Sequence, residues 1–235
     1  MRIVLLLASL FWTTAVIAQS GADDPSTWHG KATAKDLQEF GQCAVRRHPA
    51  LAREMIAKFD TYSLDDKFLK VFDPDCLGVI SDGLKLPGGT EARFMIAEAL
   101  VRTDLGALSP GSIKTAPQLL YPRLTEADFK KLTRKLDAKE IEETTTLANI
   151  TLAAMAFGEC VVRFDPATAH GFIIARPGSA AESAVISTLG PALGQCVNNG
   201  QQFKIDKAGL RGVVAVAYFR LASAAKLLPA LTVKK

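Results

Sequence analysis

One ten-residue pattern occurs twice in this chain and limits its architecture more than any other feature. The first copy, FGQCAVRRHP, spans 40–49, and the second, FGECVVRFDP, begins 117 residues later and spans 157–166. Around each copy the same order recurs: an apolar helix, a Cys, an Arg and a Pro, a second Cys, and an apolar helix led by Arg. We therefore expect an internal duplication.

The last helix predicted in each copy also indicates a duplication. Residues 92–102 and 210–220 carry Arg, Ala, Ala and Arg at matching places. Glu98 in the first copy corresponds to Val216 in the second, so we expect the second of these helices to be more buried. Gly41, inside the first ten-residue pattern, is expected to let another helix approach closely.

The four cysteines are an even number, and disulfide bonds are the default in an exported protein. Four cysteines allow three pairings. Cys43–Cys76 and Cys160–Cys196 have similar separations, 33 and 36 residues, as expected if one ancestral unit made this bond before it duplicated. We expect this pairing, although spacing alone leaves the other two open. Zinc binding is the rival, but no pair has C-x-x-C spacing and only three histidines are present.

The N-terminus predicts export. One positive charge is followed by an apolar run over 3–18, and the small residues Val16 and Ala18 precede a cleavage point at Gln19. This is the pattern of a secretory signal peptide. An uncleaved anchor is the alternative, but the run is shorter than the roughly 20 apolar residues that span a bilayer. We expect a periplasmic or extracellular protein with no stable membrane insertion after cleavage.

Composition favours a packed helical protein. Loss of the signal peptide removes one charge, so the formal net charge falls from +4 to +3. This balance argues against nucleic-acid binding, which needs a concentrated basic face. With 49% hydrophobic and 22% charged residues the chain can bury a core, and its few aromatics and many alanines favour helix packing over a β-sandwich. The expected fold is all-α, with two copies of a roughly four-helix, disulfide-stapled repeat in one globular unit.

The expected organisation follows from these features. It comprises a signal peptide (1–18), a flexible N-terminal segment (19–33), helical repeat 1 (34–105), a linker loop with a short amphipathic helix (106–146), helical repeat 2 (147–225) and a C-terminal tail (226–235).

Capping signals predict several helix starts. Asp165 is expected to cap a helix whose first turn begins with Pro166. Ser179, with Glu182 three residues later, predicts a full capping box.

A long helix is expected to start after Asp137 and to continue to Cys160. Between Leu147 and Gly158 it carries no charge. This stretch is too short to cross a membrane, so we expect it to be the central buried helix of the protein.

The sequence offers little catalytic chemistry. It has no Gly-rich phosphate loop, no G-x-S-x-G and no H-E-x-x-H motif. Cys43 and His48 could form a nucleophile pair, but residues five apart lie on different faces of a helix and an exported Cys is expected to be oxidised. His48 corresponds to the capping Asp165, and we expect it to be a surface turn residue. We assign no catalytic residue, metal ligand or cofactor.

Four arginines are candidate anion-binding residues. Arg46 and Arg163 follow the first cysteines of the two copies by three, and Arg93 and Arg211 lead the last helices. Arg binds carboxylate and phosphate in a planar two-bond geometry. The alternative is that Arg46 and Arg163 complement helix C-termini and pair with local acids.

The second pattern also carries a family resemblance. The run Cys160-Val161-Val162-Arg163-Phe164-Asp165-Pro166 resembles the Cys-Val-Val-Arg-x-Asp-Pro element that is duplicated in uncharacterised exported bacterial proteins. The first copy departs from this element at Ala44 and His48. The resemblance covers both repeats and implies no activity.

The function expected from the sequence is a non-enzymatic binding module that takes another protein, or a small anionic ligand, in a groove between the repeats. The alternative is an envelope enzyme with a site between the repeats, using His48, Asp165 and the arginines. A structural or stress-response component without a small ligand is a third reading. The sequence does not choose the partner or the oligomeric state.

Overall fold

The computed structural model describes residues 34–58, 66–77, 90–107, 110–121, 130, 133–134, 136–197 and 205–228. These residues form helices and turns and contain no strand, so the predicted all-α class is confirmed. The predicted signal peptide, the segment 19–33, most of 122–135 and the last seven residues of the tail lie outside the described residues.

In chain order the helices are α1 (Ala34–Arg47), α2 (Pro49–Lys58), the 3₁₀ helix η2 (Asp66–Val71), α3 (Pro74–Leu77), α4 (Thr90–Asp104), α5 (Pro110–Lys114), α7 (Ala138–Phe164), α8 (Pro166–Ile174), α9 (Ala180–Cys196) and α10 (Lys207–Ala224).

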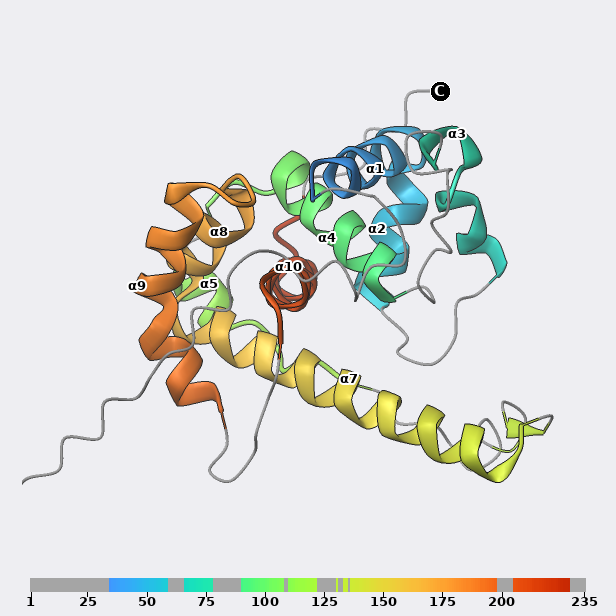
Figure 1. Cartoon of the computed structure of the whole chain (residues 1–235). Coiled ribbons are helices and arrows are strands. Elements are labelled where there is room, and N and C mark those ends of the chain that lie inside the picture. The colour runs from blue at the N-terminus through green and yellow to red at the C-terminus, as the bar shows by residue number, and fades with distance from the viewer. Residues whose placement is uncertain are drawn as a thin grey trace, which may run out of the picture.

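Helix α10 lies at the centre of the protein, and Figure 1 shows it end-on with α4, α7 and α8 around it. Every residue from Leu210 to Ala222 is buried. A helix that is apolar on all sides is stable only inside a core. The prediction that this helix is more buried than its counterpart is confirmed, since Val216 is buried whereas Glu98 of α4 is partly exposed.

Two glycines bring helix backbones into direct contact. A Cβ added to Gly41 of α1 would lie 2.4 Å from the carbonyl oxygen of Met95 in α4. A Cβ added to Gly158 of α7 would lie 2.6 Å from the carbonyl oxygen of Val213 in α10. Only glycine fits at either position without moving a backbone, and the close approach expected at Gly41 is confirmed.

Two disulfide bonds tie these helices to their neighbours. Cys43 of α1 is bonded to Cys76 of α3, and Cys160 of α7 is bonded to Cys196 of α9. The structure therefore joins the cysteines in the predicted pairs.

The long helix α7 confirms one expectation and corrects another. Asp137 accepts a hydrogen bond from the Glu140 backbone at 2.9 Å, and its own N–H donates to the Glu140 carboxylate at 2.8 Å, which completes a capping box. The expectation that α7 is the central buried helix is wrong for its first half, since Leu147 is 65% exposed and Ile150 is 55% exposed. Helix α10 occupies the centre, and the buried residues of α7 lie from Ala154 onward.

Other elements differ from expectation in detail. Part of the predicted loop after Gly106 forms the short helix α5. In the second half of the chain α9 runs unbroken through Pro191 to Cys196, whereas the corresponding part of the first half is divided between η2 and α3. The expected boundary between residues 146 and 147 falls inside α7.

Candidate functional site

Arg211, near the start of α10, joins two helix ends. Its Nη1 donates to the carbonyl oxygens of Phe172, Ile173 and Ala175 at 2.6, 2.9 and 2.9 Å, at the C-terminal end of α8. Its Nη2 donates to the carboxylate of Glu182 in α9, and both side chains are buried. A cation that donates to the last carbonyls of a helix also opposes the negative end of the helix dipole.

Glu182 corrects the predicted capping box. Ser179 Oγ accepts a hydrogen bond from the Glu182 backbone at 3.2 Å, as expected. The Glu182 carboxylate, however, accepts from the Gly178 N–H at 2.8 Å instead of from Ser179. The other carboxylate oxygen of Glu182 accepts from Arg211, and the Ser179 N–H donates to the Arg176 carbonyl oxygen at 3.1 Å.

Arg102 of α4 approaches the same end of α8. Its guanidinium donates to the carbonyl oxygens of Ile173, Ile174 and Ala175 at 2.6, 2.7 and 2.9 Å. It also pairs with Glu98 at 2.9 Å. Two arginines and two glutamates therefore balance one another around the α8 C-terminus, and they fix α4, α8, α9 and α10 together.

Arg163, at the end of α7, holds the segment that follows α5. It pairs with Glu159 at 2.8 Å and donates to the carbonyl oxygens of Ala116 and Pro117 at 2.9 and 2.7 Å. Arg46 is exposed on α1, and Arg93 is buried in α4.

The structure does not gather the four predicted arginines into one site. Arg163 and Arg211 already donate to carboxylates and carbonyl oxygens of the protein, and for Arg163 this agrees with the expected alternative of pairing with a local acid. Anion binding by Arg46, Arg93, Arg163 and Arg211 stays a prediction.

A second buried cluster surrounds Glu159. Its carboxylate accepts from the Leu119 N–H at 3.1 Å and from the Tyr121 hydroxyl at 2.9 Å. Arg220 of α10 lies over the Tyr121 ring, 5.0 Å from its centre, and its Nη2 donates to the Leu120 carbonyl oxygen at 2.8 Å. Burial raises the pKa of Tyr121, with Glu159 adding to the effect, and burial lowers the pKa of Arg220.

Two nitrogens of Arg220 have no acceptor. Within the described residues, its Nε and Nη1 are buried and have no hydrogen-bond partner. Arg220 and Tyr121 were not among the candidate site residues predicted from the sequence. The sequence signal for Arg220 was its match with Arg102 at the corresponding place of the first copy. That match did not show which residues Arg220 would contact.

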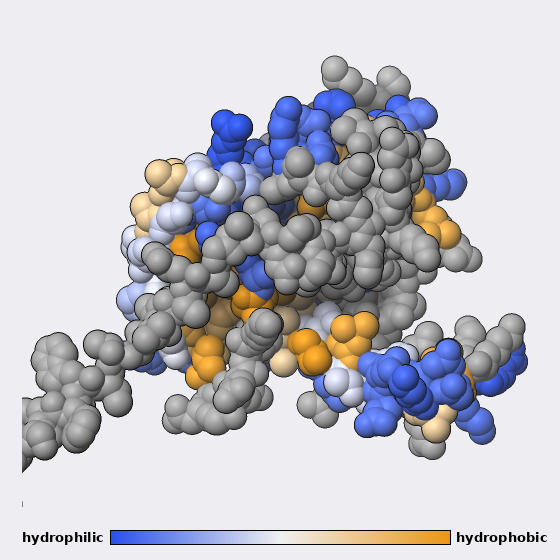
Figure 2. All heavy atoms as spheres, viewed as in Figure 1, coloured by the Kyte–Doolittle hydropathy of each residue, from blue (hydrophilic) through white to orange (hydrophobic). Residues whose placement is uncertain are grey.

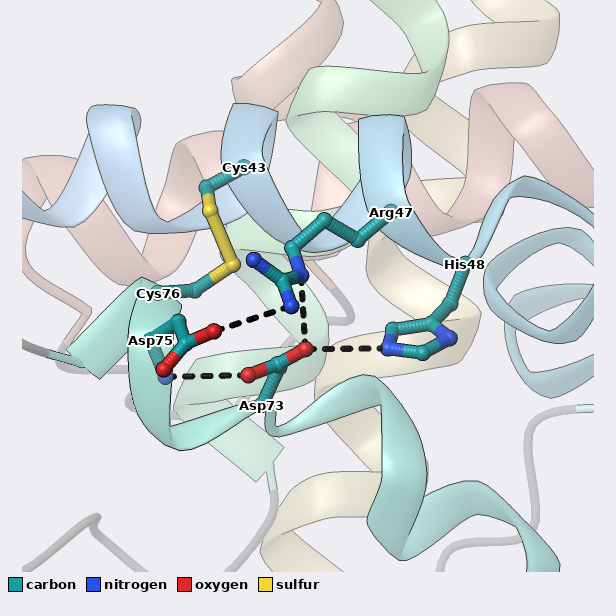
Figure 3. The surroundings of a disulfide bond; sticks show 6 residues. All are labelled: Cys43, Arg47, His48, Asp73, Asp75 and Cys76. Carbon is teal, nitrogen blue, oxygen red and sulfur yellow. Dashed lines mark hydrogen bonds and ion pairs between the residues drawn. A yellow bond between two sulfur atoms is a disulfide. The ribbon is translucent and has the colours of Figure 1, made fainter.

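A third polar cluster lies beside the Cys43–Cys76 bond (Figure 3). Asp73 Oδ2 accepts from Arg47 Nε at 2.7 Å and lies 3.3 Å from His48 Nε2. The hydrogen bond from the Asp75 N–H is the main cause that lowers the pKa of Asp73 below its ordinary value, and His48 and Arg47 lower it further.

His48 therefore orients toward a carboxylate, which is half of a general-base arrangement. Within the described residues, no hydroxyl or thiol nucleophile is hydrogen-bonded to its ring, and Cys43 is oxidised. Asp165, the other acid in the enzyme alternative, caps α8 by accepting from the Thr168 N–H at 3.0 Å and the Thr168 hydroxyl at 2.6 Å. The predicted N-cap at Asp165 is confirmed.

The first half of α7, residues 138–153, forms an arm that extends away from the other helices (Figure 1). Figure 2 shows hydrophobic surface over the middle of this helix, next to a hydrophilic surface at its N-terminal end. Leu147 and Ile150 are the large exposed apolar side chains of the arm, and no residue from 144 to 158 is charged. Within the described residues, α7 is also the one helix long and apolar enough to cross a membrane by length and composition, a test that core helices of soluble proteins pass as well.

Comparisons with protein-family models, with curated proteins and with solved structures find no match to this chain. The resemblance carried by the Cys160–Pro166 element stays a prediction. Within the described residues, no group of three or more His, Cys, Asp or Glu side chains is placed to hold a metal ion.

Proposed function

We propose that this protein is an exported helical module that binds another protein through the arm, residues 138–153 of α7. The observation that carries the proposal is the exposure of Leu147 and Ile150 on an uncharged stretch of helix. Large apolar side chains grouped on a protruding helix mark interaction surfaces. A protein partner is favoured over a small anion because Arg163 and Arg211 already donate to acceptors within the protein.

The proposal includes two copies of one helical unit, related by a pseudo-twofold axis. Gly41 contacts Met95 in the first half as Gly158 contacts Val213 in the second. Near the axis, matching positions must meet each other. Phe94 and Gly212 are such a pair, since a Cβ on Gly212 would lie 2.3 Å from the Phe94 ring. Phe94 fills the space that Gly212 leaves open.

The arm lies outside this proposed repeat. With the offset of 117, the first residue of α1, Ala34, corresponds to Thr151 of α7. Residues 138–150 correspond by the same offset to 21–33, which lie outside the described residues.

Export is part of the proposal. It is supported by the signal-peptide pattern over 1–18 and by two disulfide bonds, which persist in oxidising compartments. The periplasm or the extracellular space is the proposed location.

Site-specific photocrosslinking tests the arm. A photoreactive phenylalanine analogue replaces Ile150 in one variant and the exposed Thr188 of α9 in the control, and both are expressed with the native signal peptide. We expect a discrete protein adduct from position 150 and none from position 188. Equal labelling at both positions, or no adduct from either, would remove the arm as the binding element.

A further inference from the structure

We propose that the buried guanidinium of Arg220 in α10 binds a small monovalent anion, of the size of a carboxylate group, at its Nε. The anion supplies the counter-charge that a glutamate gives to two comparable arginines of this protein. The inference goes beyond the proposed function and involves no residue of the arm.

Two arginines of this protein are held by the glutamate four residues earlier on the same helix. In α4, the Nε of Arg102 donates to the carboxylate of Glu98 at 3.1 Å. In α7, the Nε of Arg163 donates to the carboxylate of Glu159 at 2.8 Å. Residues four apart lie on one helix face, so the glutamate reaches the guanidinium within its own helix. The spacing Glu-x-x-x-Arg therefore gives each of these arginines a carboxylate.

Arg220 has the corresponding place in its helix but lacks the acid. In the matching of residues 92–102 with 210–220, Arg220 corresponds to Arg102 and Val216 corresponds to Glu98. A valine side chain accepts no hydrogen bond. Within the described residues, the Nε of Arg220 has no partner, and this is the atom that donates to the glutamate in the other two arginines. The replacement of glutamate by valine thus accounts for the unpartnered nitrogen.

The groups around Arg220 do not neutralise its charge. Its Nη2 donates to a neutral carbonyl oxygen, that of Leu120. The carboxylate of the cluster, Glu159, already accepts from the Arg163 Nε at 2.8 Å and the Tyr121 hydroxyl at 2.9 Å. Burial raises the pKa of Tyr121, so its hydroxyl stays protonated and adds no negative charge. Two guanidinium groups therefore share one carboxylate.

The cluster at the end of α8 shows how this protein compensates buried arginines elsewhere. There Arg102 and Arg211 pair with Glu98 and Glu182, so that each cation has its own acid. Arg220 is as deeply buried as these groups, at 6% exposed, and burial lowers its pKa, as expected for a cation removed from water. Its cluster is one negative charge short of the balance that the other one reaches.

An anion meets this requirement better than water does. A water molecule can accept from Nε, but it brings no charge, and a buried charge without a counter-charge is costly. An anion supplies both the acceptor and the charge, while Nη1 needs only a neutral acceptor such as water. Because one carboxylate is missing and Val216 is 1% exposed, the ligand must be small and monovalent, such as formate or a halide ion.

Thermal unfolding of the purified exported protein tests this site, with formate as the probe. Ionic strength is held constant with a bulky sulfonate, whose anion is too large for so buried a position. The melting temperature of the wild type is expected to rise with formate and to level off. The expected rise is about 3–6 °C at ten times the dissociation constant.

Three variants assign the response to Arg220. Arg220→Met removes the charge and the donors, and its melting temperature should not respond to formate. Val216→Glu places a carboxylate four residues before Arg220, as Glu98 is placed before Arg102, so it should also lose the response. Arg176→Met is the matched control, because it removes the same charge from an exposed position and should respond as the wild type does.

Crystals of the wild type grown with bromide keep the test decisive if the variants do not fold. An anomalous peak within hydrogen-bond distance of the Arg220 Nε is expected. A wild type that shows no saturable response, an Arg220→Met protein that responds like the wild type, or crystals without bromide beside Arg220 would each overturn the inference. In those cases water alone satisfies the buried nitrogens, or the anion binds elsewhere.

Discussion

At the scale of single residues, Arg211 joins a buried carboxylate to the carbonyl end of a helix. It neutralises Glu182 and donates to three carbonyl oxygens at the end of α8. A buried charge left without its partner costs far more than the pair gains over an apolar substitute. The free energy of unfolding should therefore respond strongly, and non-additively, to changes at this pair.

Arg211→Met is expected to lower the free energy of unfolding by about 3–5 kcal/mol, because Glu182 and the α8 carbonyls lose their buried cation. The double variant Arg211→Met/Glu182→Met should be less destabilised than the sum of the two single variants. Urea unfolding followed by circular dichroism measures all three. Strict additivity would show that the two side chains do not act as a pair.

Asp73 should make stability sensitive to acid. Its pKa in the folded protein lies below the ordinary value of 3.8, so its stabilisation is complete above that value and is lost as the pH falls through the lower, folded pKa. The free energy of unfolding of Asp73→Asn should therefore change less than that of the wild type between about pH 5 and pH 2.

Asp75→Asn is the matched control for this experiment. It removes a carboxylate whose side chain is 70% exposed but keeps the backbone N–H that donates to Asp73. Its acid sensitivity should stay close to that of the wild type. If the free energy of unfolding of Asp73→Asn falls with acid as much as that of the wild type, Asp73 is not the source of the acid sensitivity.

At the scale of elements, helix contacts are set by glycine where two backbones meet. Gly41 and Gly158 each face a carbonyl oxygen of the opposite helix, at distances that a Cβ cannot occupy. Because backbone cannot rotate aside as a side chain does, the two helices of each pair would have to separate.

Gly41→Ala and Gly158→Ala are each expected to destabilise the protein by about 1–3 kcal/mol through overpacking. Gly194→Ala in α9 serves as the control, because a Cβ there meets nothing within 4 Å. This control should gain about 0.5–1 kcal/mol from helix propensity. Thermal and urea unfolding show whether each variant gains or loses stability. A loss at Gly194 equal to that at Gly158 would indicate a general intolerance of substitution instead of close packing.

Local signals in the sequence predicted several helix starts. Asp137 and Asp165 each cap the helix that follows them, because a cap depends on the next three residues alone. The expected cysteine pairs rested on their similar separations in the two copies, and the structure joins the same pairs. Burial of α7 was not predictable in this way, since two apolar helices competed for the centre and α10 occupies it.

The candidate site was harder to predict, because its contacts join residues that are far apart in the chain. The partners of Arg211 lie 29–39 residues away along the chain, and those of Arg220 lie about a hundred away. Spacing identified the arginines as unusual but could not show whether their donors reach protein atoms.

At the scale of the whole molecule, each disulfide closes a loop within one half of the chain. The separations of 33 and 36 residues are nearly equal. On the chain-entropy account a loop of this length contributes about 4 kcal/mol, so the two bonds should stabilise the protein to a similar extent. Their exposure differs, because Cys76 is buried whereas Cys160 is exposed.

Reduction should therefore separate the kinetic from the thermodynamic role of the two bonds. Under mild dithiothreitol in native buffer, Cys160–Cys196 is expected to open first, because it includes an exposed residue, whereas Cys43 and Cys76 are partly or fully buried and access limits thiol–disulfide exchange. Timed alkylation and peptide mass spectrometry give the order. The variants Cys43→Ala/Cys76→Ala and Cys160→Ala/Cys196→Ala should nevertheless lose similar unfolding free energies, about 4 kcal/mol each. If the bond that opens first also contributes far less stability, strain or residual structure in one half, and not loop length, governs how these staples act.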